Sequence, residues 1–357
     1  MTHKGNSLDT AKRLTAVAAA VALTSCGTAG FYTQALRGQA EMSARARPVS
    51  KVLADPSTKP QLRDKLRTVE DLRAFATSDL GLPAQGQYDH YADLRRRYAV
   101  WVIYAAPEFS LEAKRWWYPL VGHLKYRGFF RPAAAEKAAD RLRAEGLDVY
   151  VAGVEAYSTL GYLKDPLLNT FMGRNDAALA ELIFHELTHQ RVYLAGDTDF
   201  NEALATVVGR EGARRWLKAR GRLADLAQYD KSERVEEEFV SIALEARDEL
   251  QTVYANPGLD DTTRRLAKQA VIERLRGRVL AMNRRYGGAL KLEKWFEKPV
   301  NNARLNTLAT YYDLVPAFEA LLRECGGDLE VFLTRVENMR SLSPKERRAR
   351  MPAPPAP

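Results

Sequence analysis

Cysteine is nearly absent from this chain of 357 residues, which contains only Cys26 and Cys325. So few cysteines exclude a disulfide framework and a thiolate-rich zinc site. The chain also lacks zinc-finger spacing and a glycine-rich phosphate loop. Its formal net charge of +9 comes from basic residues that are scattered among acidic ones along helical patterns. We therefore expect solvated helix faces and no nucleic-acid partner.

Long hydrophobic runs are missing as well. The run Leu14–Leu23 is uncharged and follows three basic residues, but it is too short to cross a bilayer as a helix. It leads into "LTSC", which resembles a bacterial lipobox with Cys26 as the acylated first residue of the mature protein. The resemblance implies a signal peptide over residues 1–25 and a lipid anchor on Cys26 that holds the protein at the periplasmic side of a membrane in the bacterial cell envelope. The alternative is a plain secretory signal with a chance cysteine.

The remaining sequence divides by its hydrophobic pattern into helical and strand-forming regions. We expect a helical region over 26–97, a sheet and a metal-binding helix over 98–196, a helical domain over 197–341, and a proline-rich, disordered tail over 342–357. The expected elements after residue 97 are strands at 98–107, 115–130 and 147–159, with a helix at 132–146, and then helices at about 175–195, 200–219, 231–255, 261–284, 303–325 and 328–341. This order predicts an α+β fold, mostly helical, with a small mixed sheet followed by a C-terminal helical bundle.

The segment "LIFHELTHQRVYLAGDTDFNEALA" at 182–205 has the pattern of a catalytic metal site. Apolar residues predict a helix here, and His185 and His189 lie one turn apart on it, so both imidazoles project from the same face. Glu186 follows the first histidine, where a carboxylate can accept a proton from water. This H-E-x-x-H motif predicts one Zn²⁺ ion and hydrolysis; the alternative is two histidines that bind no metal.

A catalytic zinc ion takes three protein ligands, so a third is expected from the next helix. Glu202 lies in the first turn of that helix, far enough beyond His189 for the chain to reverse direction and return beside it. Glu211 is the other candidate, but it lies more than two turns further along. Asp197 and Asp199 are expected to be turn or N-cap residues.

Several segments together resemble the bacterial predicted aminopeptidase family of HExxH lipoproteins. Besides the lipobox and the segment at 182–205, they are "YADLRRRYAVWVIYAAPEFSL", "YRGFF", "VYVAGVEAYSTLGYLKDPLLNT" and "NNARLNTLATYYDLVPAFEALL". The resemblance implies a zincin-like fold in which His185, His189 and Glu202 bind zinc and Glu186 is the general base. Better-known zincins of this type often have an aspartate four residues after the glutamate ligand, where this chain has Thr206, so the group that orients a ligand histidine is unassigned.

Other residues are candidates for contacting a peptide substrate. The strand "VYVAGVEAYST" precedes the metal helix and offers an edge to an extended peptide. Glu155 on this strand could hold the substrate's α-ammonium group, or it could be an outward-facing strand residue. Tyr311, Tyr312 or Tyr157 could stabilise a developing oxyanion, although each can equally be a packing residue.

The sequence thus predicts a membrane-anchored zinc metallopeptidase, an aminopeptidase, whose partners are a peptide substrate and the membrane that holds Cys26. Two alternatives stay open. One is a non-catalytic envelope lipoprotein that keeps the zincin fold as a binding module. The other is a metal-dependent amidase that acts on cell-wall peptides.

Overall fold

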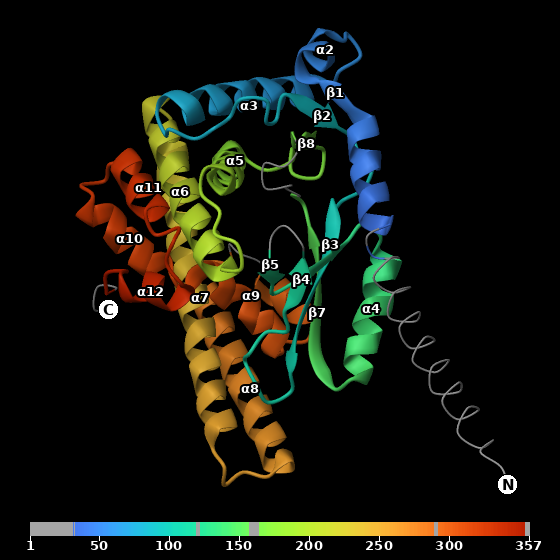
Figure 1. Ribbon diagram of the computed structural model, residues 1–357, viewed down its shortest axis with the longest axis vertical. Coiled ribbons are helices and arrows are strands. Elements are labelled where there is room, and N and C mark those ends of the chain that lie inside the picture. The colour runs from blue at the N-terminus through green and yellow to red at the C-terminus, as the bar shows by residue number, and fades with distance from the viewer. Residues whose placement is uncertain (1–30, 32, 119–121, 157–163, 289–291, 354–357) are drawn as a thin grey trace, which may run out of the picture.

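The computed structural model describes residues 31, 33–118, 122–156, 164–288 and 292–353 (Figure 1). Cys26 and Tyr157 lie outside these residues. Within them the chain is mostly helical with small sheets, and no helix has the length and apolarity needed to cross a membrane. The strands are β1 (Ala46–Pro48), β2 (His90–Ala92), β3 (Val100–Pro107), β4 (Trp116–Tyr118), β5 (Gly122–Leu124), β6 (Arg127–Phe129), β7 (Leu147–Val154) and β8 (Leu167–Leu168). The helices are 33–45, α2 (Val49–Ala54), α3 (Pro60–Ser78), α4 (Pro132–Ala144), α5 (Asp176–Arg191), α6 (Thr198–Ala219), α7 (Leu223–Ala255), α8 (Asp261–Arg285), η1 (Leu292–Glu297), α9 (Asn302–Tyr312), α10 (Val315–Glu324), α11 (Leu329–Glu337) and α12 (Pro344–Ala349).

The central sheet is antiparallel and has the strand order β6–β3–β7. β3 pairs with β7 from Val100, opposite Val154, to Pro107, opposite Leu147. Side chains alternate between the two faces of a strand. One face packs on α4, which lies along the sheet at the right of Figure 1. Tyr104 lies on the opposite face, packed against the main core.

Strand-forming sequence is divided more finely than the pattern predicted. A second sheet, β1–β2–β8, is mixed, because β2 is antiparallel to β1 and parallel to β8. The expected strand at 115–130 is three short strands, of which β4 and β5 form a hairpin. Gly122 begins β5 with φ of +76°, a left-handed conformation that favours glycine and interrupts a continuous strand.

The C-terminal region also differs from the expectation in several places. α7 begins at Leu223 and not at about 231, and α11 ends at Glu337 and not at 341. The helix expected at 303–325 is two helices, because Pro316 in the first turn of α10 has no N–H and cannot continue α9. The tail expected to be disordered from 342 contains α12, whose N-cap Ser343 forms a capping box with Glu346. Arg347 of α12 is buried, so this short helix is docked on the fold.

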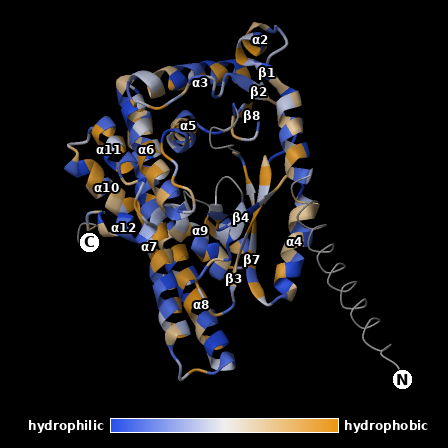
Figure 2. Cartoon of the chain, in the orientation of Figure 1, coloured by the Kyte–Doolittle hydropathy of each residue, from blue (hydrophilic) through white to orange (hydrophobic). Residues whose placement is uncertain are grey.

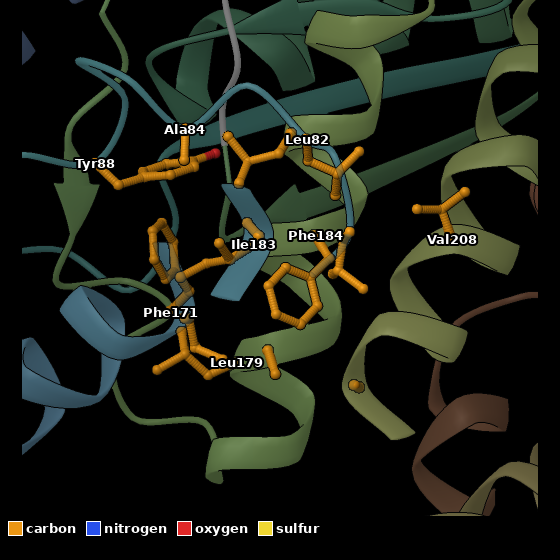
Figure 3. Close-up of a cluster of buried hydrophobic side chains, with 14 of the residues drawn as sticks. Leu82, Ala84, Tyr88, Phe171, Leu179, Ile183, Phe184 and Val208 are labelled. Atoms are coloured by element: carbon orange, nitrogen blue, oxygen red, sulfur yellow. The ribbon is translucent and has the colours of Figure 1, made fainter. Parts of the chain in front are cut away.

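The buried core around α5 and α6 positions the predicted metal ligands. Leu179, Ile183 and Phe184 of α5 pack against Val208 of α6 and the segment before β2 (Figure 3). A second buried cluster joins the facing sides of α7 and α8, and hydrophilic residues cover much of the rest of this helix pair (Figure 2). The two clusters place α5, α6 and α9 next to one another in the centre of the molecule.

Candidate metal centre

Helix α5 positions the two histidines. It begins after Asn175, whose side chain accepts a hydrogen bond from a backbone N–H of the first turn. Ile183 and Leu187 are fully buried, which fixes the rotation of the helix about its axis. The Nε2 atoms of His185 and His189 consequently face each other at 3.2 Å.

Helix α6 brings the third ligand. The chain reverses over residues 192–197, and Asn201 holds this turn by accepting from the Leu194 N–H at 2.9 Å and donating to the Leu194 carbonyl at 2.8 Å. Glu202 follows at once. Its Oε2 lies 3.3 Å from Nε2 of His185 and 3.7 Å from Nε2 of His189. The structure therefore brings the three predicted ligands together, whereas Glu211 forms an ion pair with Arg215 on the same helix.

A glycine permits the close approach of the two ligand helices. A Cβ atom on Gly209 of α6 would lie 2.8 Å from the carbonyl oxygen of Glu181 and 3.2 Å from the Cβ of His185, both on α5. Atoms other than hydrogen do not pack that closely without a hydrogen bond, so a larger residue would push the helices apart. The sequence "TVVGREG" thus contributes to the site by the absence of a side chain.

The spacing of the donor atoms fits a metal ion. Ligand atoms at about 2.0–2.1 Å from a tetrahedral zinc ion lie roughly 3.3–3.4 Å from one another. The three distances here are 3.2, 3.3 and 3.7 Å. Within the described part of the chain, this is the one group of three or more His, Cys, Asp or Glu residues whose donor atoms converge in this way. The donors are thus compatible with one metal ion.

Charge in the site suits a cation. Burial alone would raise the pKa of Glu202, but its hydrogen bonds with His185 and His189 outweigh burial and lower that pKa to about 2. Burial disfavours the charged form of His185, but Glu202 has the larger combined effect and raises the pKa of this imidazole. A carboxylate ionised across the physiological range therefore faces two imidazole nitrogens.

Glu186 lies beside the ligands without being one of them. Burial raises the pKa of its carboxyl, His185 and His189 lower it, and the carboxylates of Glu202 and Asp165 raise it further. The net direction is upward. A general base needs such a pKa, because it must accept a proton near neutral pH and return it.

Three tyrosines from separate elements surround the Glu202 carboxylate. The Tyr311 ring of α9 is nearly parallel to the His185 ring, with centroids 6.5 Å apart. Tyr104 of β3 and Tyr126, between β5 and β6, have ring centroids 6.0 Å apart. The pKa of Tyr311 is raised by the Glu202 charge and by burial, and the pKa values of Tyr104 and Tyr126 are raised by burial and by the same charge. All three hydroxyls therefore stay protonated and can donate hydrogen bonds.

A family model described as "putative aminopeptidase" matches residues 30–351. The chain belongs to this family. No curated protein and no solved structure matches the chain. Because the match contains the whole metal centre, membership in the aminopeptidase family supports a peptidase.

The other predicted site residues of this aminopeptidase family member have different surroundings. Tyr312 lies away from the ligands, because its hydroxyl donates to Glu236 at 2.6 Å and its ring centroid lies 5.3 Å from the Arg210 guanidinium. Glu155 accepts a hydrogen bond from Arg174 Nε at 2.9 Å, so its charge is already paired. The structure thus brings Tyr311 to the metal centre but neither Tyr312 nor Glu155 with it.

The histidine-orienting group that the sequence left unassigned is not found among the described residues. Nδ1 of His189 is buried and has no hydrogen-bond partner there. Thr206, which stands where related zincins have an aspartate, is buried too. A ligand histidine usually donates its second N–H to a partner, and this chain departs from that arrangement.

Several groups at the site are not predictable from the sequence. Tyr104 and Tyr126 carry no local signal, since each is an ordinary aromatic residue in strand-forming sequence. Asp165 and Tyr88, whose charge or ring lies near Glu186, are almost completely buried. Tyr88 has φ of +57°, an uncommon conformation for a bulky residue. Only the fold reveals that these residues converge.

Strand β7 is an edge strand of the central sheet, but part of its edge is occupied. Lys298 Nζ donates to the Val151 carbonyl at 3.1 Å, and Asn301 Nδ2 donates to the Val149 carbonyl at 3.0 Å. Backbone groups available to pair with an extended peptide are therefore restricted to the end of β7 beyond Val151. The short strand β8, and not β7, comes directly before the metal helix.

Proposed function

We propose that this member of the aminopeptidase family is a zinc-dependent metallopeptidase that hydrolyses peptide bonds at the N-terminus of its substrate. One observation carries the proposal: two imidazole nitrogens and a carboxylate oxygen converge at ligand spacing, with the carboxyl of Glu186 beside them. This donor set is typical of catalytic zinc. When bound there, the ion would polarise the scissile carbonyl and make water more acidic.

The residues of the chain divide the remaining work. Glu186 takes a proton from the attacking water and passes it to the leaving amine, and its raised pKa makes the carboxylate a better acceptor in the first of these transfers. Tyr311 donates a hydrogen bond to the oxygen that becomes negative as water adds to the carbonyl. Its ring is held beside His185, and its hydroxyl also interacts with Tyr104, which restrains the direction of the donor.

We also propose that a lipid on Cys26 holds the protein at the periplasmic side of a membrane. The lipobox-like "LTSC" supports this, together with the short run before it. If the proposal is right, Cys26→Ser moves the protein from the membrane fraction to the soluble fraction of the envelope, and peptidase activity is unchanged.

The decisive experiment compares Glu186→Gln with His185→Ala. The purified protein should bind about one zinc ion per chain and release N-terminal residues from a mixed peptide library. Glu186→Gln should keep the metal and lose hydrolysis by a factor of 10² or more, while His185→Ala should lose both. Full activity of Glu186→Gln would falsify the assignment of the base.

One observation favours a second candidate, a non-catalytic binding module that keeps the same fold. The missing partner for His189 Nδ1 weakens metal binding relative to sites with such a partner, typically by 10–100-fold. Under this alternative the purified protein contains no zinc, and addition of zinc produces no peptidase activity. Metal analysis before and after zinc addition separates the two candidates.

A further inference from the structure

A cavity of about 630 Å³ lies on the side of the molecule away from α10, α11 and α12. It is formed between helix 33–45 and the start of α4, which lie at the right of Figure 1. Its lining includes Arg37, Glu41, Arg96, Phe130 and Arg131. No residue of the metal centre contributes to it.

The walls of this cavity are held in place by specific contacts. Gln34 of the N-terminal helix donates to the Gly128 carbonyl at 3.4 Å and accepts from the Phe130 N–H at 2.9 Å. A Cβ on Gly38 would lie 2.0 Å from the Phe130 ring, so helix and strand end are in close contact. The cavity is therefore a built feature between two packed elements.

Charge in the cavity is unbalanced. Arg96 is committed, because it pairs with Glu41 at 2.9 Å and donates to the carbonyls of Tyr98 and Ala99. Arg37 and Arg131 form no ion pair with any described residue and are exposed to solvent. The charged residues of the lining are three arginines and one glutamate, a formal excess of two positive charges.

We propose that this cavity binds a phosphate group, and that the group belongs to the headgroup of an anionic membrane phospholipid. Guanidinium groups match phosphate oxygens in pairs, and Arg37 and Arg131 provide two uncommitted ones. The start of α4 has no side-chain cap, so its dipole favours an anion near Arg131, although Pro132 lacks an N–H and the Ala134 and Ala135 N–H groups donate to the Arg131 carbonyl.

The position of the cavity in the chain favours a lipid as the source of the phosphate. Phe31 follows Cys26 by five positions, with four residues between them. A stretch of that length spans at most about 18 Å. With a lipid on Cys26, the cavity would lie near the bilayer surface, where anionic headgroups are concentrated. The peptidase activity plays no part in the proposal.

The test uses the full mature chain with Cys26→Ser, so that no acyl chain contributes to membrane binding. Co-sedimentation is measured with vesicles of phosphatidylcholine and with vesicles that also contain phosphatidylglycerol, at physiological salt. We expect binding to the anionic vesicles, reduced about tenfold or more by Arg37→Gln with Arg131→Gln. The matched control is Arg340→Gln with Arg350→Gln, which removes the same charge from two exposed arginines near the opposite, C-terminal side.

The outcomes are distinct. Loss of vesicle binding in the Arg37→Gln, Arg131→Gln variant alone supports the proposal. Equal loss of vesicle binding in both double variants overturns it, because the net charge of the protein then explains binding. A titration with inorganic phosphate identifies the source. Phosphate binding that depends on Arg37 and Arg131, without vesicle binding, keeps the phosphate site and overturns the lipid. Absence of binding in both arms overturns the site, and unchanged thermal unfolding of the variants excludes misfolding as a cause.

Discussion

Two neighbouring tyrosines on α9 show how much a single position changes chemistry. Tyr311 stacks on His185, whereas Tyr312 donates its hydroxyl to Glu236. We expect Tyr311→Phe to lower kcat by roughly 10²-fold with little change in stability or zinc content, since it removes a donor to the oxyanion. Tyr312→Phe should lower the free energy of unfolding by about 1 kcal/mol and leave kcat nearly unchanged. Peptidase kinetics and urea unfolding of both variants check this pair, and equal kcat values would exclude Tyr311 as the donor.

A buried ion cluster behind the metal helix predicts how stability depends on pH. The Glu233 carboxyl and the Arg210 guanidinium are almost completely buried and lie against each other. Burial and the nearby Glu181 raise the pKa of Glu233 to about 8, although Arg210 lowers it. A carboxyl group with a raised folded pKa adds stability below its unfolded pKa of 4.5, and this contribution is lost as pH rises through about 8.

Glu233→Gln should therefore flatten the fall in unfolding free energy between pH 5 and 8, a slope of up to about 1 kcal/mol per pH unit. Urea unfolding at several pH values gives this slope. Glu249→Gln, at an exposed position on the same helix, is the control and should keep the wild-type slope. An unchanged slope in Glu233→Gln would mean that other groups cause it.

The residues that the sequence predicted best are those whose relation is local. His185, Glu186 and His189 are related by helical periodicity alone. Glu202 follows them after a single reversal of the chain between α5 and α6. Tyr104 comes from β3 and Tyr126 from the turn between β5 and β6, and both come near Glu202 of α6 only through the tertiary fold. No spacing in the sequence encodes that approach.

Among the helices and strands, α5 and α6 depend most clearly on a close approach of their backbones. Gly209→Ala places a methyl group 2.8 Å from a backbone carbonyl of α5, so we expect a loss of about 1–3 kcal/mol in unfolding free energy. Zinc affinity should fall as well, because the two histidines and Glu202 lie on the helices that separate. Isothermal titration with zinc and thermal unfolding measure the two effects.

Gly277→Ala is the matched control for this prediction. Gly277 lies inside α8, and a Cβ there would meet nothing within 4 Å. Alanine should stabilise this helix by about 0.5–1 kcal/mol and leave zinc affinity unchanged. If both alanine variants behaved alike, helix propensity rather than helix spacing would explain Gly209→Ala.

Element boundaries were predictable where periodicity agreed with a start or stop residue, as for α4 and α8, whereas α5 ends at Arg191 and not at the expected 195. They failed where a single backbone feature decided the outcome. Pro316 divides one expected helix into two, and Gly122 divides one expected strand. A pattern of apolar residues continues across such positions, so hydrophobic periodicity alone cannot locate the break.

For the whole molecule, α12 near the C-terminal end of the described residues is joined to the turn between the two helices that hold the candidate ligands. Arg347 and Arg348 of α12 both donate to the carboxylate of Asp197, in the turn between α5 and α6. Composition predicted disorder here, because a proline-rich tail gives no hint of a partner 150 residues away. The main core also includes residues from the N-terminal, sheet and helical regions, so the regions are joined by shared packing.

Arg347→Ala should lower the unfolding free energy by about 3 kcal/mol, because it leaves the buried carboxylate of Asp197 with one partner. Burial opposes ionisation of Asp197, but the two arginines prevail and hold its pKa below the ordinary value. The stability that ionised Asp197 contributes is therefore present above the pKa of this carboxyl in the unfolded chain, and it is lost as pH falls through its lower pKa in the folded protein. The variant should therefore lose less stability than the wild type on acidification, as measured by urea unfolding at pH 3–7.

The partly occupied edge of β7 has a consequence for the choice between trimming and internal cutting. Lys298 and Asn301 block part of that edge, so a bound polypeptide could pair with β7 over only a few residues in one direction. A strand edge that is blocked at one end favours pairing with the terminus of a chain, whereas an edge that is free along its length can pair with the middle of a long chain. We expect short peptides to be degraded stepwise and intact folded proteins to be spared.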